Sequence, residues 1–296
     1  MAGLNCAHMF YEYEIDYDTQ NSYEKGLNEA FWQFMVIPED NETQEVTYWH
    51  FENDLGERNS VSENGLGFKT VQVRSKKVID HIRFNAHFKL KKKEINPFDF
   101  DLPMNLNDEI EILNSLDFKV DHEPYLRKTR LTALPEQHRD IFLFDSNKSV
   151  FENLTDLNYW AFGHLYFKVG VTDVNTPLAE IIEKRHGVCQ DFTHLFCAVA
   201  KNNGIPCRYV SGYLHQGIGF FGDSQMHAWA EAFVPNVGWI GFDPTNNLLA
   251  NHNHIKVCHG KDYNDCAPLK GVVYTLGDNE TKYSVLVKTA EEQQQQ

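Results

Sequence analysis

The sequence predicts an α+β protein, with an N-terminal antiparallel β domain followed by a core of helices packed on an antiparallel sheet. Up to about Leu90, apolar and polar residues alternate, as in "FYEYEIDY" and "KVIDHIRFNAHFKL". From about residue 149, apolar residues recur at steps of three or four, which is the period of a helix. Short β-rich runs then return in "PCRYVSGYL", "MHAWAEAFV" and "GWIGFDP". Helices followed by neighbouring short strands indicate helices on an antiparallel sheet.

The chain length favours two domains. With 296 residues, each domain has enough chain to bury a core of its own. We expect a β-rich domain over residues 1–100, a connecting segment over 101–146 and a second core over 147–290. Prolines interrupt any long element in and beside the connecting segment, at Pro97, Pro103, Pro124 and Pro135. A single domain is the alternative.

The helices of the core have distinct sequence signals. In "SVFENLTDLNYWAFGHLYFKVG", one helical stripe is formed by Val150, Leu154, Leu157, Ala161 and Leu165. The next helix is predicted with Thr176 as N-cap, Pro177 in its first turn and Gly187 at its end. The third, "CQDFTHLFCAVAKNNG", begins at Cys189, and Gly204 supplies a left-handed stop.

Charge argues against a nucleic-acid partner. The net charge is -15, whereas phosphate binding needs clustered lysine and arginine. The one basic run, "FKLKKKEI", is short and is interpreted as a solvated strand edge. No stretch is long enough to span a bilayer, so we expect no membrane partner.

A cytoplasmic location is expected from the N-terminus and the cysteines. "MAGLNCAHMF" lacks a basic leader followed by an apolar stretch, so neither a secretory signal nor a lipid anchor is indicated. The six cysteines are scattered and form no disulfide framework, which fits a reducing compartment.

Three residues have the types and positions that acyl transfer needs. Cys189 stands at a helix start, where unpaired backbone N–H groups favour a thiolate and can bind an oxyanion. His227 begins a strand, and Asp243 ends the next one. A nucleophile, a base and a carboxylate that orients the base form a catalytic triad. Taken singly, Cys189 is more simply interpreted as a small buried residue, and His227 as one of fourteen ordinary histidines.

The register of the hairpin decides whether His227 and Asp243 can meet. If Val234 paired with Trp239, Asp243 would face away from His227. Pairing Val234 with Gly238 leaves a shorter connection and puts Asp243 one diagonal step from His227. We therefore predict this pairing, with an unusual backbone angle at Gly238, or a bulge of the same parity.

Three segments together resemble the bacterial transglutaminase-like (transglutaminase/protease) family. They are "GVCQDFTHLFCAVAKNNGIPCRYVSGYL", "MHAWAEAFVPNVGWIGFDPTNN", and "HIKV" with "GKDYNDCAPLKG", and they stand in the family's order over much of residues 185–271. The β-rich start resembles the N-terminal domain that accompanies this core in bacteria. The resemblance implies a papain-like fold for the core and a catalytic triad of Cys189, His227 and Asp243.

The resemblance implies thioester chemistry without a cofactor. We expect a cysteine hydrolase that cleaves a peptide or amide substrate. The alternatives are a transglutaminase that passes the acyl group to a primary amine and a non-catalytic binding module of the same fold. Neither composition nor motif identifies substrate-binding residues, the substrate or the oligomeric state.

Other features near these motifs have two interpretations each. Asp191 is interpreted first as a helix cap, and Trp229 either lines the site or packs in the core. The loop at 215–225 is either a flap over the site or an ordinary loop. The His and Cys residues of "NHNHIKVCHGKDYNDC" match no regular zinc spacing, and the resemblance implies no metal, so none is expected.

Overall fold

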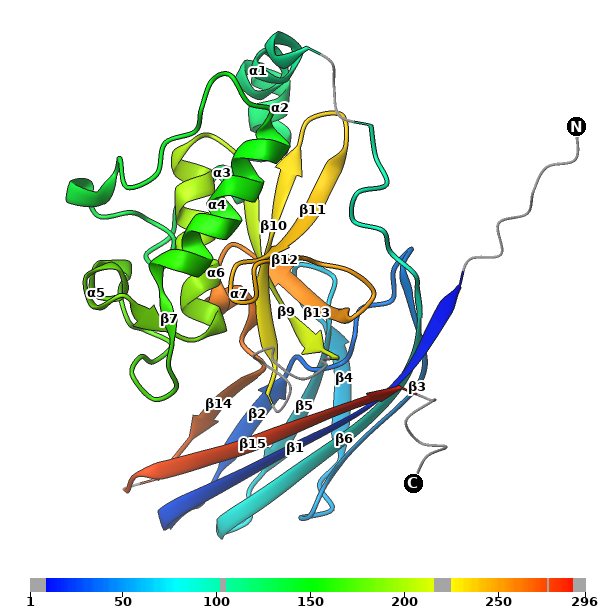
Figure 1. Ribbon diagram of the computed structural model, residues 1–296. Helices are drawn as coiled ribbons and strands as arrows, with labels where there is room; N and C mark the ends of the chain where they lie inside the picture. The colour runs from blue at the N-terminus through cyan, green and yellow to red at the C-terminus, as the bar shows by residue number, and fades with distance from the viewer. Residues whose placement is uncertain (1–8, 102–104, 216–224, 276, 290–296) are drawn as a thin grey trace, which may run out of the picture.

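The computed structural model describes residues 9–101, 105–215, 225–275 and 277–289, and it has three parts. A five-stranded sheet lies in the middle, with helices on one side of it and two four-stranded sheets on the other (Figure 1). One apolar core fills the helical side of the central sheet. A second joins its other side to the four-stranded sheets. The α+β class and the transglutaminase-like, papain-like fold expected for the core are confirmed.

The first four-stranded sheet is antiparallel, in the order β15-β1-β6-β3. Its strands are β1 (Phe10–Leu27), β3 (Gln44–Asn53), β6 (Ile79–Lys93) and β15 (Asn279–Thr289). Buried and exposed residues alternate along β1 and β6, which confirms the predicted N-terminal β structure.

The basic run lies in an inner strand, so its interpretation as a sheet edge was wrong. β6 lies between β1 and β3. Lys92 of this run is buried, and its Nζ donates to the carbonyl oxygen of His254 at 2.6 Å and to Oε1 of Gln44 at 3.1 Å. Alternation reveals which face a residue occupies but not which strands flank it.

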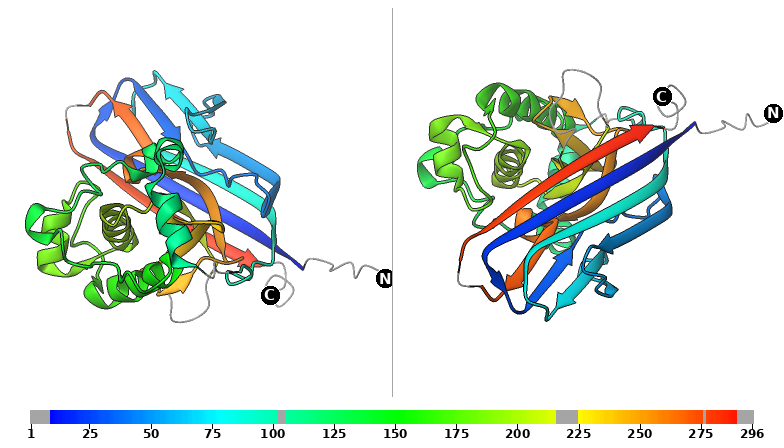
Figure 2. Two further views of the ribbon diagram at one scale, coloured as in Figure 1. Left: turned by 90° about the horizontal axis from the view of Figure 1, so that it is seen from above. Right: turned by 90° about the horizontal axis from the view of Figure 1, so that it is seen from below.

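The second four-stranded sheet has the order β14-β2-β5-β4. Its strands are β2 (Ala30–Phe34), β4 (Asn59–Glu63), β5 (Lys69–Ser75) and β14 (Leu269–Val273). Both four-stranded sheets thus receive a strand from the end of the chain. Figure 2 shows β15 beside β1 on the face seen from below.

The expected core range of 147–290 is therefore too long at its C-terminal end. β14 pairs with β2, and β15 pairs with β1 over most of its length. These pairings place residues 269–273 and 279–289 in the β sheets that the sequence assigned to the N-terminal domain alone. Hydrogen-bonded partners so far apart along the chain leave no local sequence signal.

The connecting segment contains short helices. They are α1 (Leu106–Asn114), α2 (Leu116–Asp121), α3 (Glu123–Leu126) and a 3₁₀ turn at Glu136–His138. Pro124 lies in the first turn of α3 and Pro135 precedes the 3₁₀ turn, where proline is tolerated. No described helix is long and apolar enough to cross a membrane.

The helices of the core are α4 (Val150–His164), α5 (Leu178–Lys184) and α6 (Cys189–Asn202). A capping box of Ser149 and Glu152 starts α4. After α6, Gly204 has a φ of +79°, which confirms the predicted left-handed stop.

The predicted ends of α5 were wrong. Pro177 precedes its first residue, and the Thr176 side chain instead accepts the N–H of Asp173 at 2.8 Å. Arg185 takes the left-handed conformation that ends the helix, with a φ of 55°. Gly187 belongs to β8 (His186–Gly187), which pairs in parallel with β7 (Tyr166–Phe167).

The central sheet has the order β12-β11-β10-β9-β13 and carries the predicted strands. They are β9 (Cys207–Leu214), β10 (His227–Val234), β11 (Gly238–Asp243), β12 (Leu248–Leu249) and β13 (His254–Gly260). A short helix, α7 (Tyr263–Cys266), follows β13. Helix α6 packs across β9 and β10 (Figure 1).

Candidate active site

The start of α6 holds Cys189 in a fixed place. The backbone N–H of Val188 donates to Oδ2 of Asp191 at 2.8 Å, and the Thr172 hydroxyl donates to the same oxygen at 2.6 Å. The capping interpretation of Asp191 is thus confirmed. A Cβ on Gly187 would lie 2.5 Å from Oδ2 of Asp191, so glycine is needed here for the cap to close.

The hairpin has the register predicted from the sequence. Val234 pairs with Gly238, and Gly238 has a φ of +106°. The ladder continues to the pair of Ala230 and Phe242, which leaves Asp243 on the face of His227. Nε2 of His227 lies 2.8 Å from Oδ2 of Asp243, and both side chains are fully buried.

A second histidine holds the same carboxylate. Nε2 of His254 lies 3.3 Å from Oδ2 of Asp243, while Nδ1 of His254 accepts the N–H of Asn251 at 3.2 Å. Because Nδ1 is an acceptor, the ring proton is on Nε2, where it is donated to Asp243. The carboxylate also accepts the N–H of Thr245 at 3.0 Å and the amide of Asn246 at 2.8 Å. The sequence signal for His254 was present in "HIKV" but pointed to no role.

Charges are strongly coupled inside this cluster. Burial disfavours the charged forms, but His227 and His254 hold the pKa of Asp243 well below its usual range. For His227, burial lowers the pKa, and the carboxylate of Asp243 followed by the side chain of Cys189 outweighs it and raises the pKa to about 10. Burial lowers the pKa of His254, so this ring stays neutral beside the carboxylate. The arrangement favours an imidazolium at His227 near neutral pH.

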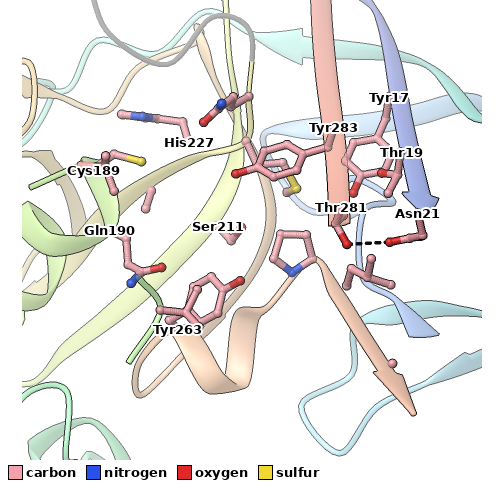
Figure 3. A pocket seen from close by; sticks show the side chains of 18 of the residues that line it. Tyr17, Thr19, Asn21, Cys189, Gln190, Ser211, His227, Tyr263, Thr281 and Tyr283 are labelled. Atoms are coloured by element: carbon pink, nitrogen blue, oxygen red, sulfur yellow. Dashed lines mark hydrogen bonds between the residues drawn. The ribbon is translucent and has the colours of Figure 1, made fainter. Parts of the chain in front are cut away.

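The remaining nitrogen of His227 is free for chemistry. Nδ1 is buried and has no hydrogen-bond partner within the part of the chain that the structure describes. Figure 3 shows the sulfur of Cys189 next to the His227 ring at one side of a cavity. Thus Asp243 holds one ring nitrogen, and the other can exchange a proton at the thiol side.

The three buried ligand groups invite a metal hypothesis. The ligand atoms of His227, Asp243 and His254 all lie within 4.8 Å of one another. Both histidines direct Nε2 at one carboxylate oxygen, so a cation would have to replace these two hydrogen bonds. Hydrogen bonding accounts for the three groups, and nothing in the donor set calls for an ion.

Two neighbouring interpretations from the sequence have different outcomes. Trp229 is buried in the core and stacks edge-on against His254, with ring centroids 5.3 Å apart. Residues 216–224 lie outside the described residues, so the flap interpretation of that loop stays a prediction.

The structure brings a thiol, an imidazole and a carboxylate together on a transglutaminase-like, papain-like fold. A protein from Cytophaga hutchinsonii, proposed to be a cysteine protease, has the same fold, with a TM-score of 0.76 and 19% identity. That superposition covers 95% of this chain and 91% of the Cytophaga chain.

The family match places the site residues in one domain. Residues 142–244, about a third of the chain, match the transglutaminase-like superfamily. Cys189, His227 and Asp243 all lie within the matched range.

Several bacterial proteins are similar in sequence. An uncharacterized protein of Mycobacterium tuberculosis is 35% identical over 145 residues, which is 46% of this chain and 46% of the relative. An uncharacterized protein of Mycobacterium leprae is 41% identical over 117 residues, covering 38% of this chain and 41% of that protein. A protein-glutamine gamma-glutamyltransferase of Pseudomonas aeruginosa is 31% identical over 71 residues, 22% of this chain and 11% of the relative. The chain thus matches less than half the length of these relatives.

Proposed function

We propose that this protein is a cytoplasmic cysteine hydrolase that cleaves an amide or peptide bond through a thioester on Cys189. The observation that carries the proposal is the buried ring of His227, bound to Asp243 through Nε2 and unpartnered at Nδ1 on the side of the thiol. A base held on one nitrogen and free on the other is what a triad requires.

The proposed reaction begins with attack on the substrate carbonyl carbon. The thiolate of Cys189 forms a C–S bond, and the carbonyl π electrons move to oxygen. The oxyanion is stabilised by backbone N–H groups at the start of α6, which have no acceptor within the helix. The imidazolium of His227 then gives its Nδ1 proton to the leaving nitrogen, and the C–N bond breaks to release an amine.

Hydrolysis of the thioester completes the cycle. A water molecule attacks the thioester carbon while Nδ1 of His227 takes one of its protons. The C–S bond breaks, and the acid leaves while the thiolate and imidazolium are restored. Asp243 stays ionised throughout and orients the ring, in keeping with its low pKa. If a primary amine replaced water, the same steps would give transglutamination.

Thiol mapping and a product screen test the proposal. Cys189 is half-buried, whereas the other described cysteines, Cys197, Cys207, Cys258 and Cys266, are buried. In a Cys6→Ser background, we expect iodoacetamide to modify Cys189 first near neutral pH. A peptide library followed by mass spectrometry should show new acids with wild type and none with Cys189→Ala. New amides only when an amine is added would replace hydrolysis by acyl transfer, and turnover by Cys189→Ala would remove Cys189 from the chemistry.

A further inference from the structure

A large cavity extends from Cys189 into the β sheets. Its volume is about 590 Å³, which is room for several side chains of a bound peptide. Cys189 and His227 lie at one side, and Asn21 of β1 and Thr281 of β15 lie opposite, as Figure 3 shows. The β sheets therefore form one wall of the candidate active site.

The part of the wall that the structure describes is aromatic and carries no fixed charge. Five tyrosines line the cavity: Tyr17, Tyr23, Tyr209, Tyr263 and Tyr283. No lysine, arginine, aspartate or glutamate of the described chain lines it. Such residues number 69 of 296 in the sequence (27 basic and 42 acidic). Cys189 and His227, the two groups that the proposed reaction uses, both lie at the reaction end of the cavity.

In the part of the chain that the structure describes, two buried polar atoms of this wall lack a hydrogen-bond partner, Oγ1 of Thr19 and Nδ2 of Asn21. Asn21 is 3% exposed, and its Oδ1 accepts the Thr281 hydroxyl at 2.6 Å. Its Nδ2 is buried with no hydrogen-bond partner in the described part of the structure. A buried donor without an acceptor is destabilising. Because Thr281 holds the side-chain amide of Asn21 in place, a substrate oxygen beside Nδ2 would gain a hydrogen bond from it.

We propose that this cavity is the substrate subsite, and that it binds an uncharged, largely apolar peptide segment that carries an oxygen acceptor for Nδ2 of Asn21. The proposal rests on the proposed function, because it takes the scissile carbonyl to lie at Cys189. Tyrosine rings supply apolar contact area with little loss of side-chain entropy. An acidic or basic side chain would lose water in this cavity without meeting a counter-ion.

Peptide binding to the inactive Cys189→Ala variant tests the subsite separately from turnover. The probes are acetylated Ala-Ala-X-Ala-Ala amides with X as Leu, Gln, Glu or Lys, measured by titration calorimetry. Gln and Glu have nearly the same shape and differ in charge. We expect the Leu and Gln peptides to bind at least about tenfold more tightly than the Glu and Lys peptides. Equal or tighter binding of the Glu or Lys peptide, or binding of none of the four, would overturn the proposal.

Two wall variants and a control locate the binding. In the Cys189→Ala background, Asn21→Leu should weaken binding of the Gln peptide by about tenfold. Gln20 is the neighbouring residue of β1 and its side chain lies on the opposite face, so Gln20→Leu should leave binding of the Gln peptide unchanged. Thr281 is exposed, so Thr281→Lys should fold and shift preference toward the Glu peptide. Equal effects of Asn21→Leu and Gln20→Leu, or no gain for Glu with Thr281→Lys, contradict the proposal. Neutral-peptide binding by Cys189→Ala without turnover by wild type would instead refute the hydrolase alone.

Discussion

At the scale of single residues, the carboxylate of Asp243 lies between two histidines with different tasks. His227 faces the thiol, whereas His254 is neutral, buried and held on its far nitrogen by the backbone of Asn251. In the proposed mechanism, His254 therefore acts through Asp243 and is a positioning residue. Two histidines and the amide of Asn246 meet one carboxylate oxygen and fix it more firmly than a single histidine would.

Replacing His254 should lower the rate without weakening substrate binding. In His254→Leu, Asp243 loses one charge-assisted hydrogen bond, so kcat should fall by roughly 10- to 100-fold with KM unchanged. His254→Gln keeps a donor near the position of Nε2 and should restore much of kcat. His252→Leu, nearby and stacked on Tyr11, is the control. An equal loss of kcat in His254→Leu and His254→Gln would indicate a purely structural role for His254.

The sequence predicted three members of this cluster and missed the fourth. Cys189 was predicted from its place at a helix start. His227 and Asp243 were predicted from the alternation of side chains along a hairpin, and the hairpin register that brings them together was confirmed. His254 comes from β13, which reaches the sheet on the far side of β9. Its approach to Asp243 depends on strand order, which local periodicity does not contain.

At the scale of elements, the turn into α6 depends on a glycine for a tertiary reason. Gly187 was predicted as the end of α5, yet the helix ends at Arg185. Position 187 requires glycine, because the side chain of Asp191 occupies the space that a Cβ atom would take. A glycine near a helix end fits both interpretations, and only the distance to Asp191 separates them.

Exchanging two glycines for alanine should have opposite effects. Gly187→Ala pushes the Asp191 carboxylate from the N–H of Val188, so it should cost about 1 kcal/mol or more of stability and lower kcat by displacing Cys189. Gly163→Ala, in α4 with open space around it, should add about 0.5–1 kcal/mol and leave kcat unchanged. Urea unfolding and steady-state rates measure both. A Gly187→Ala protein as stable and as active as wild type would show that the cap does not position the nucleophile.

At the scale of the whole molecule, a largely buried ion cluster joins the central sheet to the N-terminal part of the chain. Glu231 of β10 lies 2.5 Å from Nε of Arg208 in β9 and 2.8 Å from Nζ of Lys256 in β13. Lys256 is also 3.9 Å from Glu39. Burial disfavours ionised Glu231, but Lys256 and Arg208 outweigh it and lower the pKa of Glu231 to about 2.

This cluster should make the free energy of unfolding depend on pH in the acid range. The pKa of Glu231 lies below the ordinary value of 4.5, so its contribution is full above pH 4.5 and is lost as the pH falls through about 2. Glu231→Gln removes the carboxylate partner of part-buried Arg208 and leaves buried Lys256 with Glu39 alone, at 3.9 Å. It should cost about 3 kcal/mol at pH 7, a difference that shrinks toward pH 2. Glu180→Gln removes an exposed pair with Lys184 and should change nothing measurable. Urea unfolding at pH 7 and pH 3 checks this, and a pH-independent difference would contradict it.

The fold class was predictable from the sequence, but the pairing of distant strands was not. Composition and alternation indicated β sheets before a helical core, and both are present. Strand partners more than 250 residues apart, such as Tyr17 and Val285, were not predictable, because alternation is the same whichever neighbour a strand takes.

The pairing of β15 with β1 also sets the order in which the site is completed during synthesis. A chain still emerging from the ribosome has Cys189, His227 and Asp243 well before the strand that carries Thr281 and Tyr283. Until that strand docks, β1 lacks one neighbour and the cavity lacks one wall. If the proposed function and subsite hold, the nascent protein has its nucleophile before it has a wall to bind substrate, and we expect hydrolysis to begin only after β15 has paired with β1.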